Sequence, residues 1–144
     1  MTAIHPATLK FLKDLAKNND RDWFNQHKSS YLTAHQNLCD FLDRFIFTMS
    51  KHDELETLSG KESLLRIYSD VRFSKNKAPY KPRFAFSLPR ATKLRRGGYC
   101  GVVKPGESFL AVANNVFISV RPFFDYMSDV LTTNANGQSL FEES

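Results

Sequence analysis

The spacing of apolar residues changes near residue 60, and this change limits the possible folds more than any other feature of the chain. Up to Met49, apolar residues recur every three to four positions, as on one face of a helix. After the breaker Ser59-Gly60 they alternate with polar residues, as along a strand buried on one side. A chain of 144 residues, 42% of them hydrophobic, can bury one core. The pattern therefore predicts an α+β domain with N-terminal helices packed on a mostly antiparallel sheet.

The first 49 residues are predicted to form helices. Pro6 suits the first turn of a helix over about residues 6–17, which Asn18-Asn19 would end. Asp20 is a good N-cap for a second start. From Tyr31 to Met49 the 3.6-residue period continues for about five turns. We expect this long helix to cross the whole domain as its spine.

Strands are predicted over residues 64–73 and 83–88, and over 99–103 and 108–112 as a hairpin around a Pro-Gly turn. In the first strand the inward side chains would be Leu65, Ile67, Val71 and Phe73, and the outward ones Arg66, Tyr68, Asp70 and Arg72. In the second, Phe84, Phe86 and Leu88 would point inward. Residues 123–131 could form a short amphipathic helix, whereas residues 132–144 are polar and acidic. We therefore predict one domain over residues 1–131 and a disordered tail over 132–144.

Positive charge is concentrated in the middle of the chain. Residues 66–104 carry 11 basic side chains and one acidic one, whereas the segments before and after them are both net negative. Six of the basic residues lie in residues 66–83, which we call the basic segment. A purely solvated charge run has no reason to alternate with apolar residues, but a basic surface on a packed sheet does. An anionic partner is therefore expected, and nucleic acid is one partner of this kind.

Within the basic segment, residues 74–82 read as a polar loop stiffened by two prolines. Stiffening lowers the entropy lost when lysines converge on a phosphate or carboxylate. The loop could equally be a solvated connection, and its tyrosine could serve β packing rather than stacking on bases. The residues proposed to bind an anion are Arg66, Arg72, Lys75, Lys77, Tyr80 and Lys81.

Asp70 is the single acid of the basic segment and has two readings. It could accept hydrogen bonds from Arg66 and Arg72, and so hold two guanidinium groups apart. It could instead be a metal ligand or a base beside a bound phosphate, with the Tyr80 hydroxyl as a second weak catalytic candidate. Neighbouring arginines would lower the pKa of Asp70, which suits a ligand and handicaps a base.

Other chemistries have little support. The four histidines form no HxH or HExxH pair, so no metal site is predicted. The glycines around Tyr99 lack the spacing of a nucleotide-binding loop, and no cofactor is expected. Cys39 and Cys100 are predicted to be reduced, buried thiols. The sequence shows no apolar run of about 18 residues and no signal-peptide core, which indicates a cytoplasmic protein without a membrane span.

Three stretches resemble the domain-of-unknown-function family 2461, widespread in bacteria. Residues 18–24, NNDRDWF, resemble its NN-x-R-x-WF opening, and residues 66–81, RIYSDVRFSKNKAPYK, resemble its central RI-x-RDVRFS-x-(D/N)K-x-PYK signature. Gly98-Tyr99 and residues 104–110, KPGESFL, resemble its later strand pair. The resemblance covers about residues 4–111. It implies an intracellular α+β domain without an established function, and it supplies no catalytic residue.

The chain also departs from the family pattern. Ser69 stands where the family usually has Arg, Cys100 replaces a usual Tyr, and residues 112–115 replace a glycine-rich stretch. The resemblance implies further C-terminal helices, so this chain is expected to be a truncated or frame-shifted member. The sequence thus leaves three functional hypotheses: a module that binds a phosphate-bearing ligand, an enzyme acting on a small phosphorylated or carboxylated substrate, and a purely structural Arg–Asp–Lys network. It does not decide the oligomeric state.

Overall fold

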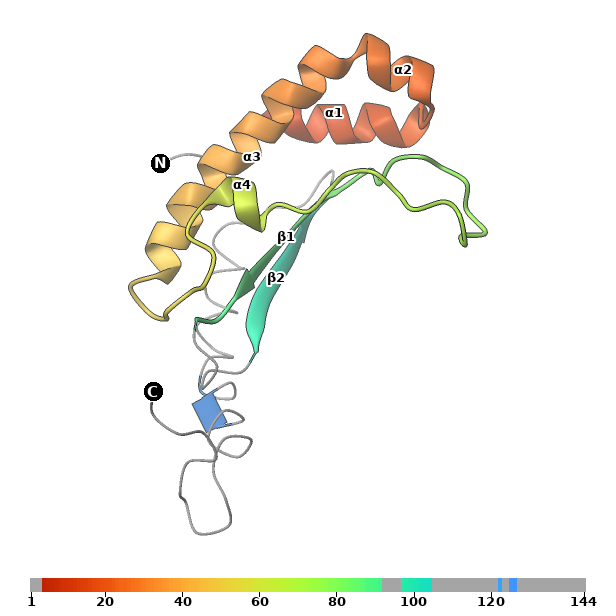
Figure 1. The fold of residues 1–144 in the computed structure, drawn as a ribbon. Helices are drawn as coiled ribbons and strands as arrows, with labels where there is room; N and C mark the ends of the chain where they lie inside the picture. Colours follow the sequence, from red (N-terminus) through yellow and green to blue (C-terminus); the bar gives the residue numbers. More distant parts are fainter. Residues whose placement is uncertain (1–3, 92–96, 105–121, 123–124, 127–144) are drawn as a thin grey trace.

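The computed structural model describes residues 4–91, 97–104, 122, 125 and 126 (Figure 1). Its described elements are, in chain order, α1 (Pro6–Lys17), α2 (Arg21–Gln26), α3 (Lys28–Met49), α4 (Gly60–Ser63), β1 (Phe84–Pro89) and β2 (Gly98–Val103). The helices lie on one side of the two strands (Figure 1). The predicted α+β class, with N-terminal helices packed on an antiparallel sheet, is confirmed. No helix in the described ranges is both long and apolar enough to span a bilayer.

The helices begin where the capping residues predicted. Pro6 is the first residue of α1, and the Asp20 side chain accepts a hydrogen bond from the Trp23 backbone at 2.8 Å to cap α2. The second helical stretch is divided at His27, after which α3 continues for 22 residues. One part of α3 packs in a cluster with Phe11 and Phe84, and the rest packs in a second cluster with Phe86. The predicted spine is therefore α3.

The two described strands form an antiparallel pair whose register runs from Phe84 opposite Val103 to Pro89 opposite Gly98. Phe84, Phe86 and Leu88 are buried, as their alternation predicted. On the partner strand Tyr99 and Val103 are buried, while Cys100 is exposed. The expectation of a buried Cys100 was therefore wrong, because alternation along β2 turns this residue to the outer face. Cys39 is buried as predicted, and both thiols are free.

The predicted strand over residues 64–73 was wrong. This segment forms only isolated bridges in the described residues, Leu64 with Phe86 and Tyr68 with Tyr80, and no continuous strand. Ile67 is buried, but the side chain of Phe73 is 94% exposed. The cause is the change of pairing partner: the segment leaves β1 after residue 65 and then pairs with its own continuation at Tyr80. Residues 69–79 therefore form a loop instead of a strand.

The predictions for the C-terminal part fall largely outside the described residues. These are the strand over 108–112, most of the helix over 123–131 and the disordered tail over 132–144. Pro122, Asp125 and Tyr126 are helical. Asp125 also contacts the domain, because its carboxylate accepts a hydrogen bond from the Arg90 guanidinium.

Arg90 is the centre of a buried polar cluster at the far end of the strand pair. Its Nε lies 2.8 Å from Oδ2 of Asp53, and both side chains are fully buried. The Tyr99 hydroxyl donates to the same Oδ2 at 2.7 Å. The Glu54 backbone amide donates to Oδ1 at 2.9 Å. The cluster joins β1, β2 and the segment after α3 through one carboxylate.

Candidate functional site

The basic segment is held against the helices at Tyr80. The Asn19 side chain bonds both backbone groups of Tyr80: its Nδ2 donates to the carbonyl oxygen at 2.7 Å, and its Oδ1 accepts from the amide at 3.0 Å. The Tyr80 ring stacks on Phe24, with centroids 4.0 Å apart. Thus residues of two separate sequence motifs, 18–24 and 66–81, contact each other directly.

Backbone bonds close the loop at its base. Ser69 donates to the Pro79 carbonyl at 2.9 Å, and Lys81 donates to the Ile67 carbonyl at 2.8 Å. Inside the loop, the Ser74 hydroxyl accepts from the Asn76 amide at 3.2 Å, and the Asn76 side chain accepts from the Ala78 amide at 3.0 Å. Such turns are typical of Ser and Asn, whose short side chains bond the backbone two residues further on. The loop shape is therefore fixed by hydrogen bonds as well as by Pro79 and Pro82.

Asp70 and Arg72 form a bidentate ion pair. Oδ1 of Asp70 accepts from the Arg72 Nε at 3.0 Å, and Oδ2 accepts from Nη2 at 2.8 Å. The side chains are 59% and 77% exposed, so the pair lies in solvent. Hydrogen bonds from the Arg72 guanidinium and backbone lower the pKa of Asp70, and the charge of Arg66 adds to this effect. Asp70 thus accepts from one of the two arginines expected to share it.

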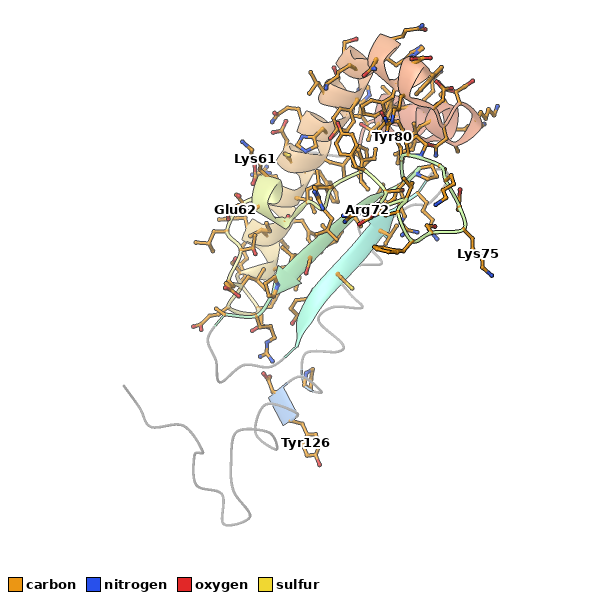
Figure 2. The ribbon with its side chains drawn as sticks, turned by 45° about the vertical axis from the view of Figure 1, so that its right-hand side comes forward. Lys61, Glu62, Arg72, Lys75, Tyr80 and Tyr126 are labelled. Carbon is orange, nitrogen blue, oxygen red and sulfur yellow. The ribbon has the colours of Figure 1, made fainter. Side chains whose placement is uncertain are left out.

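Lys77 is also engaged within the segment. Its ammonium donates to the Val71 carbonyl at 2.7 Å, across the loop. The four other basic side chains of the segment make no ion pair with the described part of the chain: Arg66, Lys75, Lys81 and Arg83. Figure 2 shows Lys75 pointing outward from the outer end of the loop.

A polar hollow of about 460 Å³ lies at the inner side of the loop. It is lined by Ser69, Asp70, Ser74, Asn76, Ala78, Tyr80, Lys81, Pro82 and Arg83. Lys81 and Arg83 supply positive charge there, and the two serines supply hydroxyl groups. Because Asp70 is neutralised by Arg72, the cations dominate the charge of the hollow. Such a lining can hold an anion through charge and hydroxyl donors together.

Of the residues predicted to bind an anion, Lys81 and Tyr80 line the hollow, whereas Arg66, Arg72, Lys75 and Lys77 do not appear in its lining. Tyr80 is 6% exposed, and its ring belongs to the core. Burial raises the pKa of its hydroxyl. Sequence reasoning did not include Ser69, Ser74, Asn76 and Arg83. Arg83 directly precedes the inward Phe84, so alternation along the strand places it outward and was a usable signal. Nothing in the spacing marked the serines as neighbours of Lys81.

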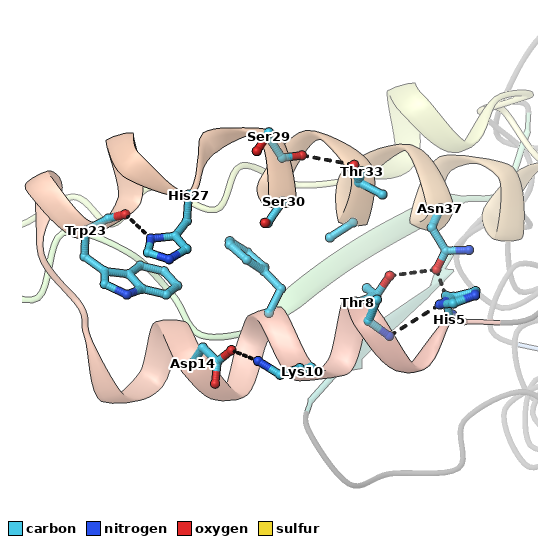
Figure 3. A pocket seen from close by; sticks show the side chains of 13 residues that line it. His5, Thr8, Lys10, Asp14, Trp23, His27, Ser29, Ser30, Thr33 and Asn37 are labelled. Atoms are coloured by element: carbon cyan, nitrogen blue, oxygen red, sulfur yellow. Dashed lines mark hydrogen bonds and ion pairs between the residues drawn. The ribbon is translucent and has the colours of Figure 1, made fainter.

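A second hollow, of about 570 Å³, lies between α1 and α3 (Figure 3). Trp23 and His27 stack at one end with ring centroids 4.1 Å apart, and His27 Nδ1 lies 2.8 Å from the Trp23 carbonyl oxygen. At the other end Asn37 accepts from the Thr8 hydroxyl at 2.8 Å. Lys10 and Asp14 pair with each other on its α1 side. The charged groups of this hollow therefore satisfy one another.

The described residues contain no cluster of metal ligands, since no three His, Cys, Asp or Glu side chains converge there. Asp70 is exposed and its pKa is lowered, so it is a poor proton acceptor near neutral pH. The arrangement is thus better suited to holding an anion than to transferring a proton.

The fold and this loop define a small α+β domain with a basic, internally braced segment beside its strand pair. The family model of the conserved hypothetical protein DUF2461 matches residues 7–115, and the chain belongs to this family. No curated protein and no solved structure matches the chain.

Proposed function

We propose that this protein binds a phosphate-bearing ligand in the hollow of the basic segment. The observation that carries the proposal is the position of Lys81 and Arg83 on one hollow, without a carboxylate partner in the described residues and next to an already paired Asp70. A phosphate would accept hydrogen bonds from both cations and from Ser69 or Ser74. Arg66, Arg72, Lys75 and Lys77 would add longer-range attraction.

The rival structural network receives less support. It requires the basic side chains to meet Asp20, Asp22 or Asp43, but no ion pair joins the basic segment to these carboxylates in the described residues. Asp20 instead caps α2, and Asp43 accepts from the Gly60 amide at 2.6 Å. The enzyme hypothesis requires Asp70 as a base or metal ligand, and its exposed pair with Arg72 supplies neither a raised pKa nor a ligand cluster. A cytoplasmic location fits a phosphate-bearing ligand and stays a prediction.

Pyrophosphate binding by titration calorimetry at low salt tests the proposal. We expect the variant K81Q/R83Q to bind at least about tenfold more weakly, because two charge-assisted hydrogen bonds are lost. K13Q/K61Q removes the same charge from α1 and α4 and is expected to keep the affinity nearly unchanged. Equal loss in both variants, or no binding of pyrophosphate by the unmodified protein, would contradict a specific site in the hollow.

A further inference from the structure

We infer that the ligand of the basic segment is single-stranded nucleic acid, with a base stacked on the ring of Phe73. This inference rests on the proposed phosphate site and adds to it a second contact, made by an apolar group. It identifies the ligand as a chain in which phosphates alternate with planar rings.

Phe73 is the most exposed of the large hydrophobic side chains in the described residues, at 94%. A phenylalanine ring in water forgoes the free energy that burial would provide, and an exposed ring is available to stack on a ligand. The ring is not on a loose end, because Arg72 before it pairs with Asp70, and Ser74 after it accepts from the Asn76 amide. The loop thus presents Phe73 at a defined position.

The loop that carries Phe73 combines charge with a second exposed ring. The Arg72 guanidinium lies 5.9 Å from the Phe73 ring centre, in cation–π range. Ser74, the next residue, lines the hollow that also holds Lys81 and Arg83. Tyr68, at the base of the loop, is 48% exposed. An exposed ring whose chain neighbour lines a cationic hollow combines stacking with charge, as in proteins that hold single strands without reading their sequence.

The strand must be single, because a base within a duplex is stacked on both faces and cannot cover a side-chain ring. An anionic bilayer is the other ligand that exposed rings and cations could attract. It is disfavoured here because the chain neighbours of Phe73 are Arg72 and Ser74 and the adjoining hollow is mostly polar. Single-stranded nucleic acid matches both the ring and the polar hollow.

The test compares ligands with and without bases. Binding of a fluorescent oligothymidylate is measured by anisotropy at low salt, beside binding of inorganic polyphosphate. F73A is expected to weaken oligothymidylate binding by about 5- to 100-fold, the range found for loss of one stacked base. Its affinity for polyphosphate is expected to stay unchanged, and F73W is expected to restore oligonucleotide binding.

Phe47 supplies a matched control. It is 62% exposed on α3, and the Lys51 ammonium lies 5.0 Å from its ring centre, so F47A removes an exposed ring beside a cation elsewhere. We expect F47A to bind both ligands like the unmodified protein. The melting temperature of each variant is measured first. We expect it to be unchanged, because substitutions at exposed side chains rarely alter stability.

Three outcomes would overturn the inference, and they separate it from the proposed function. If F73A binds oligothymidylate normally while K81Q/R83Q does not, phosphate binding stands and base stacking is wrong. If the protein binds polyphosphate or anionic phosphatidylserine vesicles but no oligonucleotide, nucleic acid is the wrong ligand. If it binds no polyanion even at low salt, the inference and the proposed function both fail.

Discussion

At the scale of single residues, Asn19 explains how an irregular segment stays in place. Its side-chain amide bonds the amide and the carbonyl of Tyr80, as the backbone of a neighbouring strand would. Two buried backbone groups are satisfied without a further strand. The stacked rings of Phe24 and Tyr80 complete this junction. The position of the basic segment therefore depends on a contact between Asn19 and Tyr80, which are 61 residues apart in the chain.

We predict that N19A lowers the free energy of unfolding by about 1–3 kcal/mol, because both Tyr80 backbone groups lose their partner in a partly buried place. Chemical denaturation measures the loss. N18A is the matched control, since in the described residues the Asn18 side chain bonds only the Asp14 carbonyl, at the exposed end of α1. N19A should also weaken pyrophosphate binding, because Asn19 holds Tyr80 and the next residue is Lys81, which lines the hollow. Equal stability of N18A and N19A would show that the junction does not hold the segment.

At the scale of elements, periodicity predicted those parts whose partners are regular. The helices and the strand around Phe86 have one buried face, and the pattern of that face is written in the sequence. The segment around Phe73 alternates equally well, yet it pairs with its own continuation at Tyr80, which is in turn held by Asn19. Pairing of this kind leaves no trace in residue spacing. The positive charge of the candidate site was predictable because charge follows from composition. The shape of the hollow was not predictable, because it depends on where the loop folds back.

The short helix α4 shows how closely two elements can approach. A Cβ on Gly60 would lie 2.3 Å from the Cys39 carbonyl oxygen and 2.9 Å from the Leu42 Cβ, both on α3. The Gly60 amide also donates to the Asp43 carboxylate at 2.6 Å. Glycine is therefore required at this position because only its missing side chain allows the contact.

We predict that G60A is destabilised by about 1–3 kcal/mol, the usual cost of forcing extra atoms into a packed contact, and by more if α4 detaches. Thermal melting followed by circular dichroism measures the change. K61A, one position later and exposed, is the control and should melt like the unmodified protein. A G60A protein of normal stability would mean that α4 does not pack on α3 as closely as described.

At the scale of the whole molecule, α3 joins two aromatic clusters, and the charged groups lie at opposite ends of the strand pair. The basic segment adjoins the cluster that holds Phe24 and Tyr80. The Arg90 cluster closes the other end and contacts Asp125, beyond the matched family residues. Asp125 is thus joined to the domain through a buried cation. Removing one partner of a buried ion pair lowers the free energy of unfolding by about 3–5 kcal/mol. We therefore expect Asp53 to be essential for the stability of the end of the strand pair that holds Arg90.

The pH dependence of stability tests this cluster. Burial acts to raise the pKa of Asp53, but the Tyr99 hydroxyl and the Arg90 charge outweigh it, so the pKa lies below its usual value. Since the pKa is lower in the folded state, the stabilisation is complete above about pH 5 and is lost as the pH falls below about 4 and through the folded pKa. Y99F removes one hydrogen bond to this carboxylate, so we expect it to lose about 1.5–3 kcal/mol near pH 7.

The difference between Y99F and the unmodified protein should narrow as the pH falls below about 4, because a protonated Asp53 gains less from the hydroxyl in either protein. Urea denaturation at several pH values measures this narrowing. Y126F is the matched control: the Tyr126 side chain is 64% exposed, so its change should leave stability unaltered at every pH. A loss in Y99F that stayed constant from neutral to acid pH would mean that the hydroxyl packs in the core without stabilising the charged form of Asp53.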